Sequence, residues 1–562
     1  MARSDRTAFL ITFAGFLARF WTASGTFLNP DEALHFRLAN QLSLATAYQQ
    51  SLTAAHPPLL ILFLYYWRAL GTSELWLRLP SVIAGAVFCW MFYKWLTKTV
   101  GPLAGLIGLL FVAFLPPIVA LFAEIRQYPL LLAFLISALY FLDEAFALNS
   151  AGCMALFSLC LYLAMGFHYS AFLFAAALGV YALLKIFQEH PPIRLTIVWM
   201  LGQLGALAIA AFLYKTHLSQ LSEGTPRTLT ENLMGDYYLR HSLFDRAHDN
   251  PLLFVVGHSF GVFQYFFGQL AVGDVMGLVF VAGVIFLLRG KTSQAPTSSG
   301  NCPSPRLLGV FLLLPFAITA SVSLAHFYPY GGTRHINFLM IPAITGVSIT
   351  IASLASRWGR RDLRESDLSA SALNKNPLLR GFAIAFFVLG VCILFGKPRQ
   401  PRMTRANQDR AHMTAAIQFL RQNVGPSDVI FTDYKTDLVL GHYLCDQQPI
   451  AFDPAPPGFE QFSCAGHKIV STDFVEWMFT SQNFPGDWRH LLASYSPKAA
   501  ETIWVAQAGW GIEHAEDLRV DMPQLNDGRL ESFGQNIKIF KISVTAPVSG
   551  TLSSSSRPSL RP

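Results

Sequence analysis

The chain has 562 residues, of which 53% are hydrophobic and only 13% are charged, and its formal net charge is +7. Soluble globular proteins carry about 25% charged residues, so this composition excludes an ordinary soluble protein. Apolar runs recur from residue 8 to residue 396, and many reach the roughly 20 residues that span a bilayer. We expect a mostly α, polytopic membrane protein whose excess Lys and Arg lie in cytoplasmic loops rather than on a nucleic-acid-binding surface.

The first apolar run follows a basic start and lacks an A-x-A-like cleavage site at the right distance, which indicates a retained first span. Arg19 lies inside this run, near its outer end, and needs a partner or a route to the interface. The stretch "LNPDEALHF" follows, in which Asp31 and Glu32 come directly after a Pro and precede His35. Taken alone, such a pair favours a helix cap that complements the helix dipole.

The distribution of Lys and Arg sets the expected side of each loop. The apolar segment 57–70 is only fourteen residues long, so we expect it to lie at the interface or re-enter, and 252–270 to lie in the outer interface. The remaining runs predict about eleven spans, with a cytoplasmic N-terminus and an external C-terminal part. After the first run, the spans are expected at 80–97, 101–122, 128–147, 151–167, 169–187, 194–214, 272–289, 307–325, 335–355 and 379–396.

The composition changes at residue 397, so we expect a transmembrane domain at 1–396 and a small extracytoplasmic α/β domain at 397–545. Within the second part, the patterns predict a helix at 411–424 and strands at 427–433, 501–509 and 536–544. Residues 546–562 are typical of a disordered tail. Cys445 and Cys464 could form a disulfide in an extracytoplasmic domain, which the sequence leaves open.

The predicted topology brings polar residues to one membrane face. Each has an ordinary alternative, such as a helix cap, a turn residue, a snorkelling arginine or a histidine at a span end. Together, carboxylates, arginines and histidines at one face suit an anionic headgroup and acid–base chemistry. The residues concerned are Asp31, Glu32, His56, Glu124, Arg126, Tyr128, His168, Tyr169, Arg334 and His335.

An ordered series of motifs carries a family resemblance: "NPDEA", "HPPL", "GTSELWLRLPS", "AEIRQYPLL", "HYSAFLF" and "TRHINFLMIPAI". Over roughly residues 8–355 the chain resembles the C-type glycosyltransferases. The nearest likeness is to the dolichyl-phosphate-mannose–protein mannosyltransferase-like group, which includes the bacterial aminoarabinose transferases. Relatives often carry Tyr where His335 stands, and some carry Lys where His56 stands.

The resemblance implies an integral enzyme that moves a sugar from a polyprenyl-phosphate donor to an acceptor hydroxyl at the outer membrane face, with inversion. Carried over by position, Asp31 resembles the general base and Glu32 its orienter. The implied phosphate contacts are His56, Arg126 and Arg334, the implied site-lining residues are Glu124 and Tyr128, and His168, Tyr169 and His335 are further substrate-binding candidates. The Asp-Glu pair with His could also hold a divalent metal, which the family does not generally require.

Three other functions are compatible with parts of the pattern. An oligosaccharide ligase or oligosaccharyltransferase-like enzyme shares the chemistry and differs in its acceptor and donor. A secondary transporter predicts midplane ionisable groups and inverted repeats, and a non-catalytic anchor needs far fewer spans. We expect a multi-pass protein of a bacterial inner membrane, whose acceptor is a protein, lipid or glycan, and no nucleotide-binding motif is visible in the soluble domain.

Overall fold

The computed structural model describes residues 3–219, 239–290, 304–362, 376–396, 408–474, 477–480, 483–495, 502–510 and 530–543. The chain forms two compact units, Met1–Arg405 and Ala406–Pro562. The tail expected at 546–562 lies outside the described residues.

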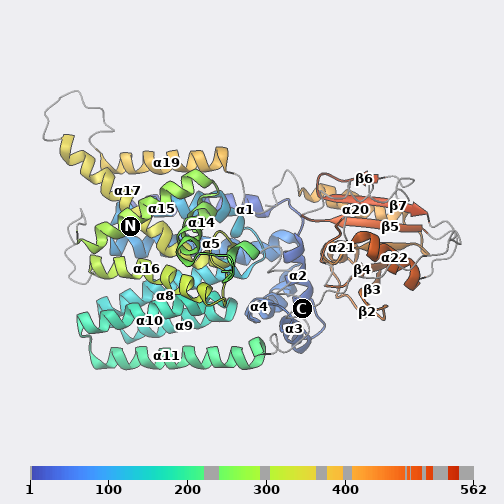
Figure 1. Ribbon diagram of the computed structural model, residues 1–562, viewed down its shortest axis with the longest axis horizontal. Helices are drawn as coiled ribbons and strands as arrows, with labels where there is room; N and C mark the ends of the chain where they lie inside the picture. Colours follow the sequence, from blue (N-terminus) through green and yellow to red (C-terminus); the bar gives the residue numbers. More distant parts are fainter. Residues whose placement is uncertain are drawn as a thin grey trace. The chain divides into compact units, whose positions relative to one another are not determined.

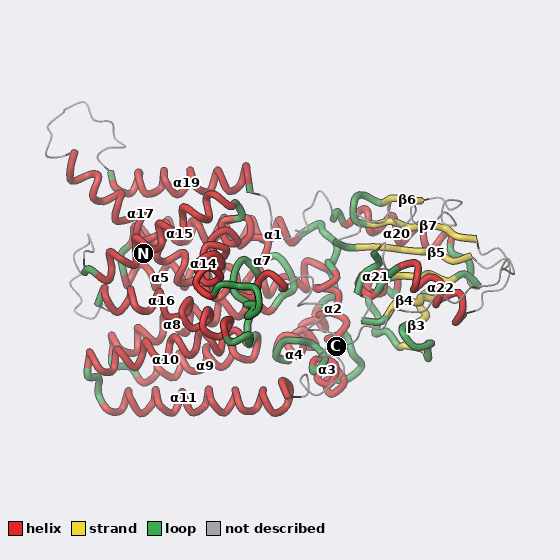
Figure 2. Tube along the Cα trace, viewed as in Figure 1, coloured by secondary structure: helices red, strands yellow, loops and turns green. Residues whose placement is uncertain are grey.

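The described part of the first unit is helical (Figures 1 and 2). Its elements are α1 (Arg3–Ala23), α2 (Pro30–Ala39), α3 (Leu44–Ser51), α4 (Leu59–Trp67), η1 (Arg68–Leu70), α5 (Glu74–Thr99), α6 (Pro102–Phe114), α7 (Pro116–Leu121), α8 (Gln127–Leu148), α9 (Ala151–Phe167), α10 (Ser170–Glu189), α11 (Ile193–Leu213), η2 (Tyr214–Leu218), η4 (Arg240–Ser242), α14 (Pro251–Phe267), α15 (Leu270–Leu288), α16 (Pro305–Leu324), η5 (Arg334–Leu339), α17 (Met340–Asp362) and α19 (Pro377–Phe395).

Among the described residues, eight helices are long and apolar enough to cross a membrane, which confirms the predicted helical membrane bundle. They are α5, α8, α10, α11 with η2, α15, α16, η5 with α17, and α19. The helices lie roughly side by side, with α11 and α19 at the two edges of the bundle (Figure 1). The expected total of about eleven passes is reached when α1, α9 and the α6–α7 pair also cross.

The segment 57–70 forms a short helix rather than a span. Helix α4 has nine residues and η1 adds three, which at 1.5 Å per residue gives about 18 Å against the roughly 30 Å of a hydrocarbon core. Helix α4 packs against α2, α3 and α9. This agrees with the prediction that the segment does not cross the bilayer.

The single helix expected at 101–122 is broken after α6, because Pro116 and Pro117 have no N–H to continue the helix. Arg19 compensates for this break. Its guanidinium is fully buried and donates to the Val112 carbonyl at 2.5 Å and to the Gly15 carbonyl at 2.9 Å. The buried arginine therefore satisfies backbone carbonyls inside the bundle instead of reaching toward the interface.

A buried ion pair ties three long helices together. The Asp143 carboxylate on α8 accepts hydrogen bonds from Trp95 on α5 at 2.8 Å and from Tyr181 on α10 at 2.9 Å. It also receives the Lys185 ammonium at 2.9 Å. Every group in this set is paired, so we assign it a structural role in the bundle.

The second unit is a seven-stranded mixed sheet in the order β2-β3-β4-β1-β5-β7-β6, with helices packed on it. Strand β1 pairs in parallel with β4 and β5, and the outer pairs are antiparallel. The small α/β domain is therefore confirmed. Its elements are α20 (Arg410–Asn423), β1 (Val429–Thr432), α21 (Tyr434–Leu444), β2 (Phe452–Asp453), β3 (Phe459–Cys464), β4 (His467–Thr472), α22 (Phe484–Tyr495), β5 (Thr502–Ala508), β6 (Leu530–Ser532) and β7 (Ile537–Ser543).

A disulfide joins the end of α21 to the end of β3. Cys445 and Cys464 are bonded, with their Cα atoms 5.2 Å apart. The pairing that the sequence left open is thus made within the second unit.

Candidate active site

Helix α2 begins with a capping box. The Asn29 side chain accepts a hydrogen bond from the Glu32 backbone N–H at 2.9 Å, and the Glu32 carboxylate accepts one from the Asn29 N–H at 3.0 Å. Pro30 occupies the first turn, where its missing N–H has no cost. Asn29 and Glu32 therefore supply the cap, and Asp31 takes no part in it.

Glu32 is completely buried in a framework of hydrogen bonds. Arg78 on α5 donates to both of its carboxylate oxygens at 2.7 Å, and the Ile125 N–H donates to one of them at 2.9 Å. Arg78 also donates to the Thr26 and Phe27 carbonyls. The sequence predicts that Glu32 lies beside the base and orients it. In the structure, Glu32 holds α2 against α5 and the loop before Arg126. Arg78 stands in the "RLPS" motif, but it was not among the predicted site residues.

Asp31 has different partners from its neighbour. Its Oδ2 atom contacts the guanidinium of Arg126 and lies 2.9 Å from Arg334 Nη1. Glu124 Oε2 lies 3.8 Å from Arg126 Nε. The Asp31 side chain is 14% exposed, whereas that of Glu32 is fully buried. We call Asp31, Glu124, Arg126 and Arg334 the carboxylate–arginine cluster, and the structure brings all four together from separate segments of the chain.

A row of histidines begins at the same helix. His35 Nδ1 lies 2.5 Å from the Asp31 carbonyl, and its ring stacks on His56 with centroids 6.4 Å apart. The His56 ring lies 5.0 Å from that of His168, which in turn lies 4.9 Å from the Tyr128 ring. We call His35, His56 and His168 the histidine row. The predicted residues His56, Tyr128 and His168 are thus connected to the Asp31 backbone through the ring of His35.

The histidine row is uncharged near neutral pH. Burial, followed by the charge of Arg334, lowers the pKa of His35 to about 4. Burial, followed by His335 and Arg334, lowers the pKa of His168 to about 3, and burial holds the pKa of His56 well below its usual value. These rings therefore act through hydrogen bonds rather than as cations.

The tautomer of His168 follows from its contacts. The Ser170 backbone N–H donates to His168 Nδ1 at 3.0 Å, so Nδ1 is an acceptor and the ring proton sits on Nε2. The Nε2 atom is buried and has no hydrogen-bond partner among the described residues. His168 therefore has an N–H available to donate to a ligand.

The two remaining predicted residues have their own contacts. The Tyr169 hydroxyl bonds to His217 in η2, and burial raises the pKa of Tyr169. The backbone carbonyl of His335 accepts a hydrogen bond from the Tyr328 hydroxyl at 2.8 Å. His335 is close enough to His168 to affect its pKa, so it belongs to the site, while Tyr169 is directed toward a different partner.

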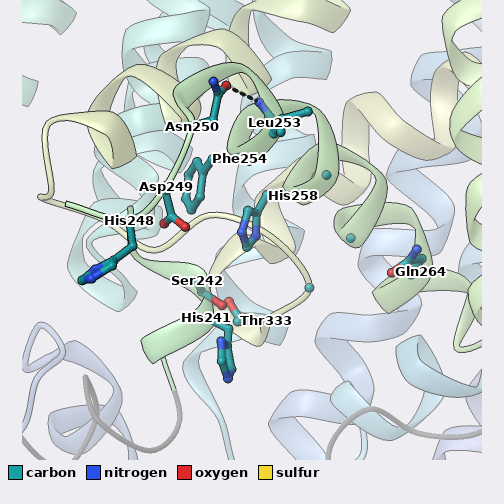
Figure 3. A pocket seen from close by; sticks show the side chains of 13 residues that line it. His241, Ser242, His248, Asp249, Asn250, Leu253, Phe254, His258, Gln264 and Thr333 are labelled. Atoms are coloured by element: carbon teal, nitrogen blue, oxygen red, sulfur yellow. Dashed lines mark hydrogen bonds between the residues drawn. The ribbon is translucent and has the colours of Figure 1, made fainter. Parts of the chain in front are cut away.

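A cavity of about 900 Å³ lies beside the cluster, and none of the predicted site residues lines it. Its walls come from the segment before α14, from α14 itself, and from Gly332 and Thr333, which directly precede Arg334 (Figure 3). The lining residues are His241, Ser242, His248, Asp249, Asn250, Leu253, Phe254, Gly257, His258, Gly261, Gln264, Gly332 and Thr333.

The candidate metal ligands are otherwise engaged. Glu32 is bonded to Arg78, and Asp31 contacts two guanidiniums. Within the described ranges, no group of three or more His, Cys, Asp or Glu side chains is arranged to hold a metal ion. The Asp-Glu-His set considered from the sequence therefore does not fit a divalent cation in this arrangement.

Residues 55–214 match the family model described as dolichyl-phosphate-mannose-protein mannosyltransferase. The resemblance predicted from the sequence is borne out over this segment, which is less than a third of the chain. Several candidate site residues fall inside the matched segment, namely His56, Glu124, Arg126, Tyr128, His168 and Tyr169. The matched family is one of membrane glycosyltransferases. Asp31 and Arg334 lie outside the segment, so their place in the site rests on the geometry.

Two solved structures resemble the chain over much of its length. One is ArnT from Cupriavidus metallidurans bound to undecaprenyl phosphate, with 13% identity, a TM-score of 0.48, and coverage of 97% of this chain and 99% of that chain. The other is the Archaeoglobus fulgidus oligosaccharyltransferase tethered with an acceptor peptide, with 9% identity, a TM-score of 0.45, and coverage of 89% and 69%. With TM-scores below 0.5, neither likeness assigns a role to a residue here. No curated protein sequence matches the chain significantly.

Proposed function

We propose that this protein transfers a sugar from a polyprenyl-phosphate carrier to an acceptor hydroxyl, with inversion at the sugar carbon, at the extracytoplasmic face of the membrane. The observation that carries the proposal is the position of the Asp31 carboxylate against both Arg126 and Arg334. A carboxylate base and two fixed cations are the groups that displacement of a sugar phosphate requires.

Arg126 and Arg334 can bind the phosphate of the donor. A guanidinium matches the geometry of a phosphate and binds it through paired, charge-assisted hydrogen bonds. The unpartnered Nε2–H of His168 adds a neutral donor beside them. When the donor phosphate binds, it competes with Asp31 for the arginines and so releases the carboxylate to act as a base.

The displacement then needs one base. The acceptor oxygen bonds to the anomeric carbon as the bond from that carbon to the phosphate oxygen breaks, and the hydroxyl proton passes to Asp31. Both arginines contact Oδ2 of Asp31, so Oδ1 is the oxygen that can face the acceptor. A retaining route would use a second carboxylate as nucleophile, and the neighbouring Glu32 is held by Arg78 instead.

Two observations support the extracytoplasmic face. The positive-inside pattern directs the end of α1, where α2 begins, away from the cytoplasm. For the second unit, the disulfide between Cys445 and Cys464 is of a kind that persists in oxidising compartments, such as a bacterial periplasm. A lipid-linked donor suits this face because its isoprenoid tail can remain in the bilayer while the sugar phosphate reaches the aqueous edge.

The donor and the stereochemistry can be tested together. The full-length protein in lipid nanodiscs is given radiolabelled sugars on polyprenyl phosphate or on nucleoside diphosphate, with a membrane extract as the source of acceptor. We expect transfer only from the polyprenyl-phosphate sugars and not from the nucleotide sugars. NMR should show that the anomeric configuration of the product is opposite to that of the donor. Transfer from the nucleotide sugar, or retention of configuration, would contradict the proposal.

A further inference from the structure

The cavity beside the cluster is lined by groups that can form hydrogen bonds. None of the lining residues that the structure describes is Lys or Arg, and their polar side chains are hydroxyls, amides, imidazoles and the carboxylate of Asp249. The rings of Phe254 and His258 lie 4.1 Å apart and supply an aromatic surface. Figure 3 shows Asp249 and His258 on either side of the space above Ser242 and Thr333. This lining does not suit a phosphate, which calls for guanidinium or ammonium groups.

Thr333 gives this cavity a direct connection to Asp31. Its side chain is only 5% exposed, yet its hydroxyl has no hydrogen-bond partner among the described residues. A buried hydroxyl without a partner is costly, so it marks a position where a ligand group is expected. The next residue in the chain is Arg334, which contacts Asp31.

The wall that carries Thr333 is held in place by close backbone contacts. Gly331 has a φ of +119°, and a Cβ at this position would lie 2.4 Å from His258 Nδ1. The Tyr330 N–H donates to the Ser242 carbonyl at 2.7 Å, and the Tyr330 hydroxyl bonds to Ser259 at 2.7 Å. The position of the Thr333 hydroxyl is therefore set by the packing of the loop against α14.

We propose that this cavity binds the acceptor, that the acceptor group is a neutral saccharide, and that the Thr333 hydroxyl hydrogen-bonds to it and directs its reacting hydroxyl toward Asp31. Hydroxyl, amide and carboxylate partners with an aromatic surface match the many hydroxyls and apolar faces of a sugar. The transfer step rests on the proposed function, whereas saccharide binding to the cavity does not.

Binding is tested with the full-length protein in nanodiscs. A panel of neutral methyl glycosides, the corresponding sugar phosphates and a Ser/Thr-containing peptide are compared by saturation-transfer NMR. We expect at least one neutral glycoside to bind more tightly than the sugar phosphates and the peptide. In Thr333→Val its affinity should fall by roughly 10-fold, while the Tm is unchanged or higher, because the variant removes an unpartnered buried hydroxyl. A hydroxyl with a purely structural role would lower the Tm instead.

Thr12→Val is the matched control. Thr12 on α1 is also buried with an unpartnered hydroxyl among the described residues, but it does not line the cavity. This variant should bind the glycoside as the wild type does. The proposal is overturned if no neutral glycoside binds, if the phosphate or the peptide binds more tightly, or if Thr333→Val keeps full affinity. If a glycoside binds but no sugar is transferred in any assay, the proposed function fails and the cavity assignment stands.

Discussion

The Oδ2 atom of Asp31 lies 2.9 Å from Arg334 Nη1, although the two residues are 303 positions apart in the chain. The contact joins the start of α2 to the start of η5, which leads into α17. The candidate site is therefore assembled by long-range packing, and its charge balance changes when an anionic substrate competes for either arginine.

Replacing Arg334 by Lys should weaken donor use. Lysine keeps the charge but loses the planar fork that holds a phosphate through two bonds. Hydrogen bonds between charged groups contribute about 1.5–3 kcal/mol, so we expect the KM for a polyprenyl-phosphate sugar to rise roughly 10- to 100-fold. Arg68→Lys is the control, because Arg68 bonds to Asn40 and Gln41. An unchanged KM in Arg334→Lys would argue against a phosphate contact.

The two adjacent carboxylates should respond differently to mutation. Arg78→Met leaves Glu32 buried without its counterion, and breaking such a pair costs about 3–5 kcal/mol. We therefore expect a large fall in Tm for Arg78→Met in detergent or nanodiscs. Asp31→Asn should fold with a Tm near that of the wild type. Equal losses of stability in the two variants would contradict the division of roles between Glu32 and Asp31.

The histidine row should make folding sensitive to acid. Unfolded histidine has a pKa near 6.5, whereas burial lowers that of His35 to about 4 and that of His168 to about 3. The unfolded state therefore binds more protons below pH 6.5, and stability falls as the pH drops toward those values. Each ring should lower the free energy of unfolding at pH 5 by about 2 kcal/mol relative to its value at neutral pH.

Thermal unfolding at pH 5 and pH 7.5 measures this effect. We expect His168→Gln to show a smaller acid-induced fall in Tm than the wild type. His190→Gln serves as the control, because His190 is exposed at the end of α10 and lies outside the histidine row. If Tm falls by the same amount in the wild type and in His168→Gln between pH 7.5 and pH 5, the rings of the histidine row are not uncharged in the folded protein.

The disulfide should stabilise the second unit. It links residues 19 positions apart, and closing a loop of that size contributes about 3 kcal/mol. We expect Cys445→Ser to lower the unfolding temperature of the second unit, with little change in the helical unit. When cells are alkylated before lysis, mass spectrometry should find Cys445 and Cys464 unmodified, because disulfide-bonded sulfurs do not react with the alkylating agent. Free thiols at these positions in growing cells would contradict the assignment of this unit to an oxidising compartment.

The spans could be predicted because each one must match the thickness of a bilayer, and that length shows directly in an apolar run. The break between α6 and α7 was missed, although Pro116 and Pro117 mark it in the sequence. In the second unit, helix α21 was not predicted because its buried face includes Lys435 and Asp437, which do not look like core residues. Strand β3 was also overlooked, because its two phenylalanines lie three positions apart and do not show the alternation typical of a strand.

The candidate site was predictable where several ionisable residues followed one another in recognisable motifs, as around Asp31 and Arg126. Its supporting residues were not. Arg78 is one arginine in an apolar helix, and only its contacts with Glu32 reveal its role. Thr333 is an ordinary residue in a loop until the structure shows a buried hydroxyl on a cavity wall. Such roles depend on which distant segments pack together, which one sequence does not specify.

The proposed function requires Asp31 to act as the base of a transfer from a polyprenyl-phosphate sugar. The most direct test measures single-turnover transfer and donor binding in the same preparations of wild type and Asp31→Asn. General bases contribute about 10²- to 10⁴-fold, so we predict a loss of transfer of that size while donor binding is kept or strengthened. Transfer by Asp31→Asn within a few-fold of the wild-type rate would contradict the account.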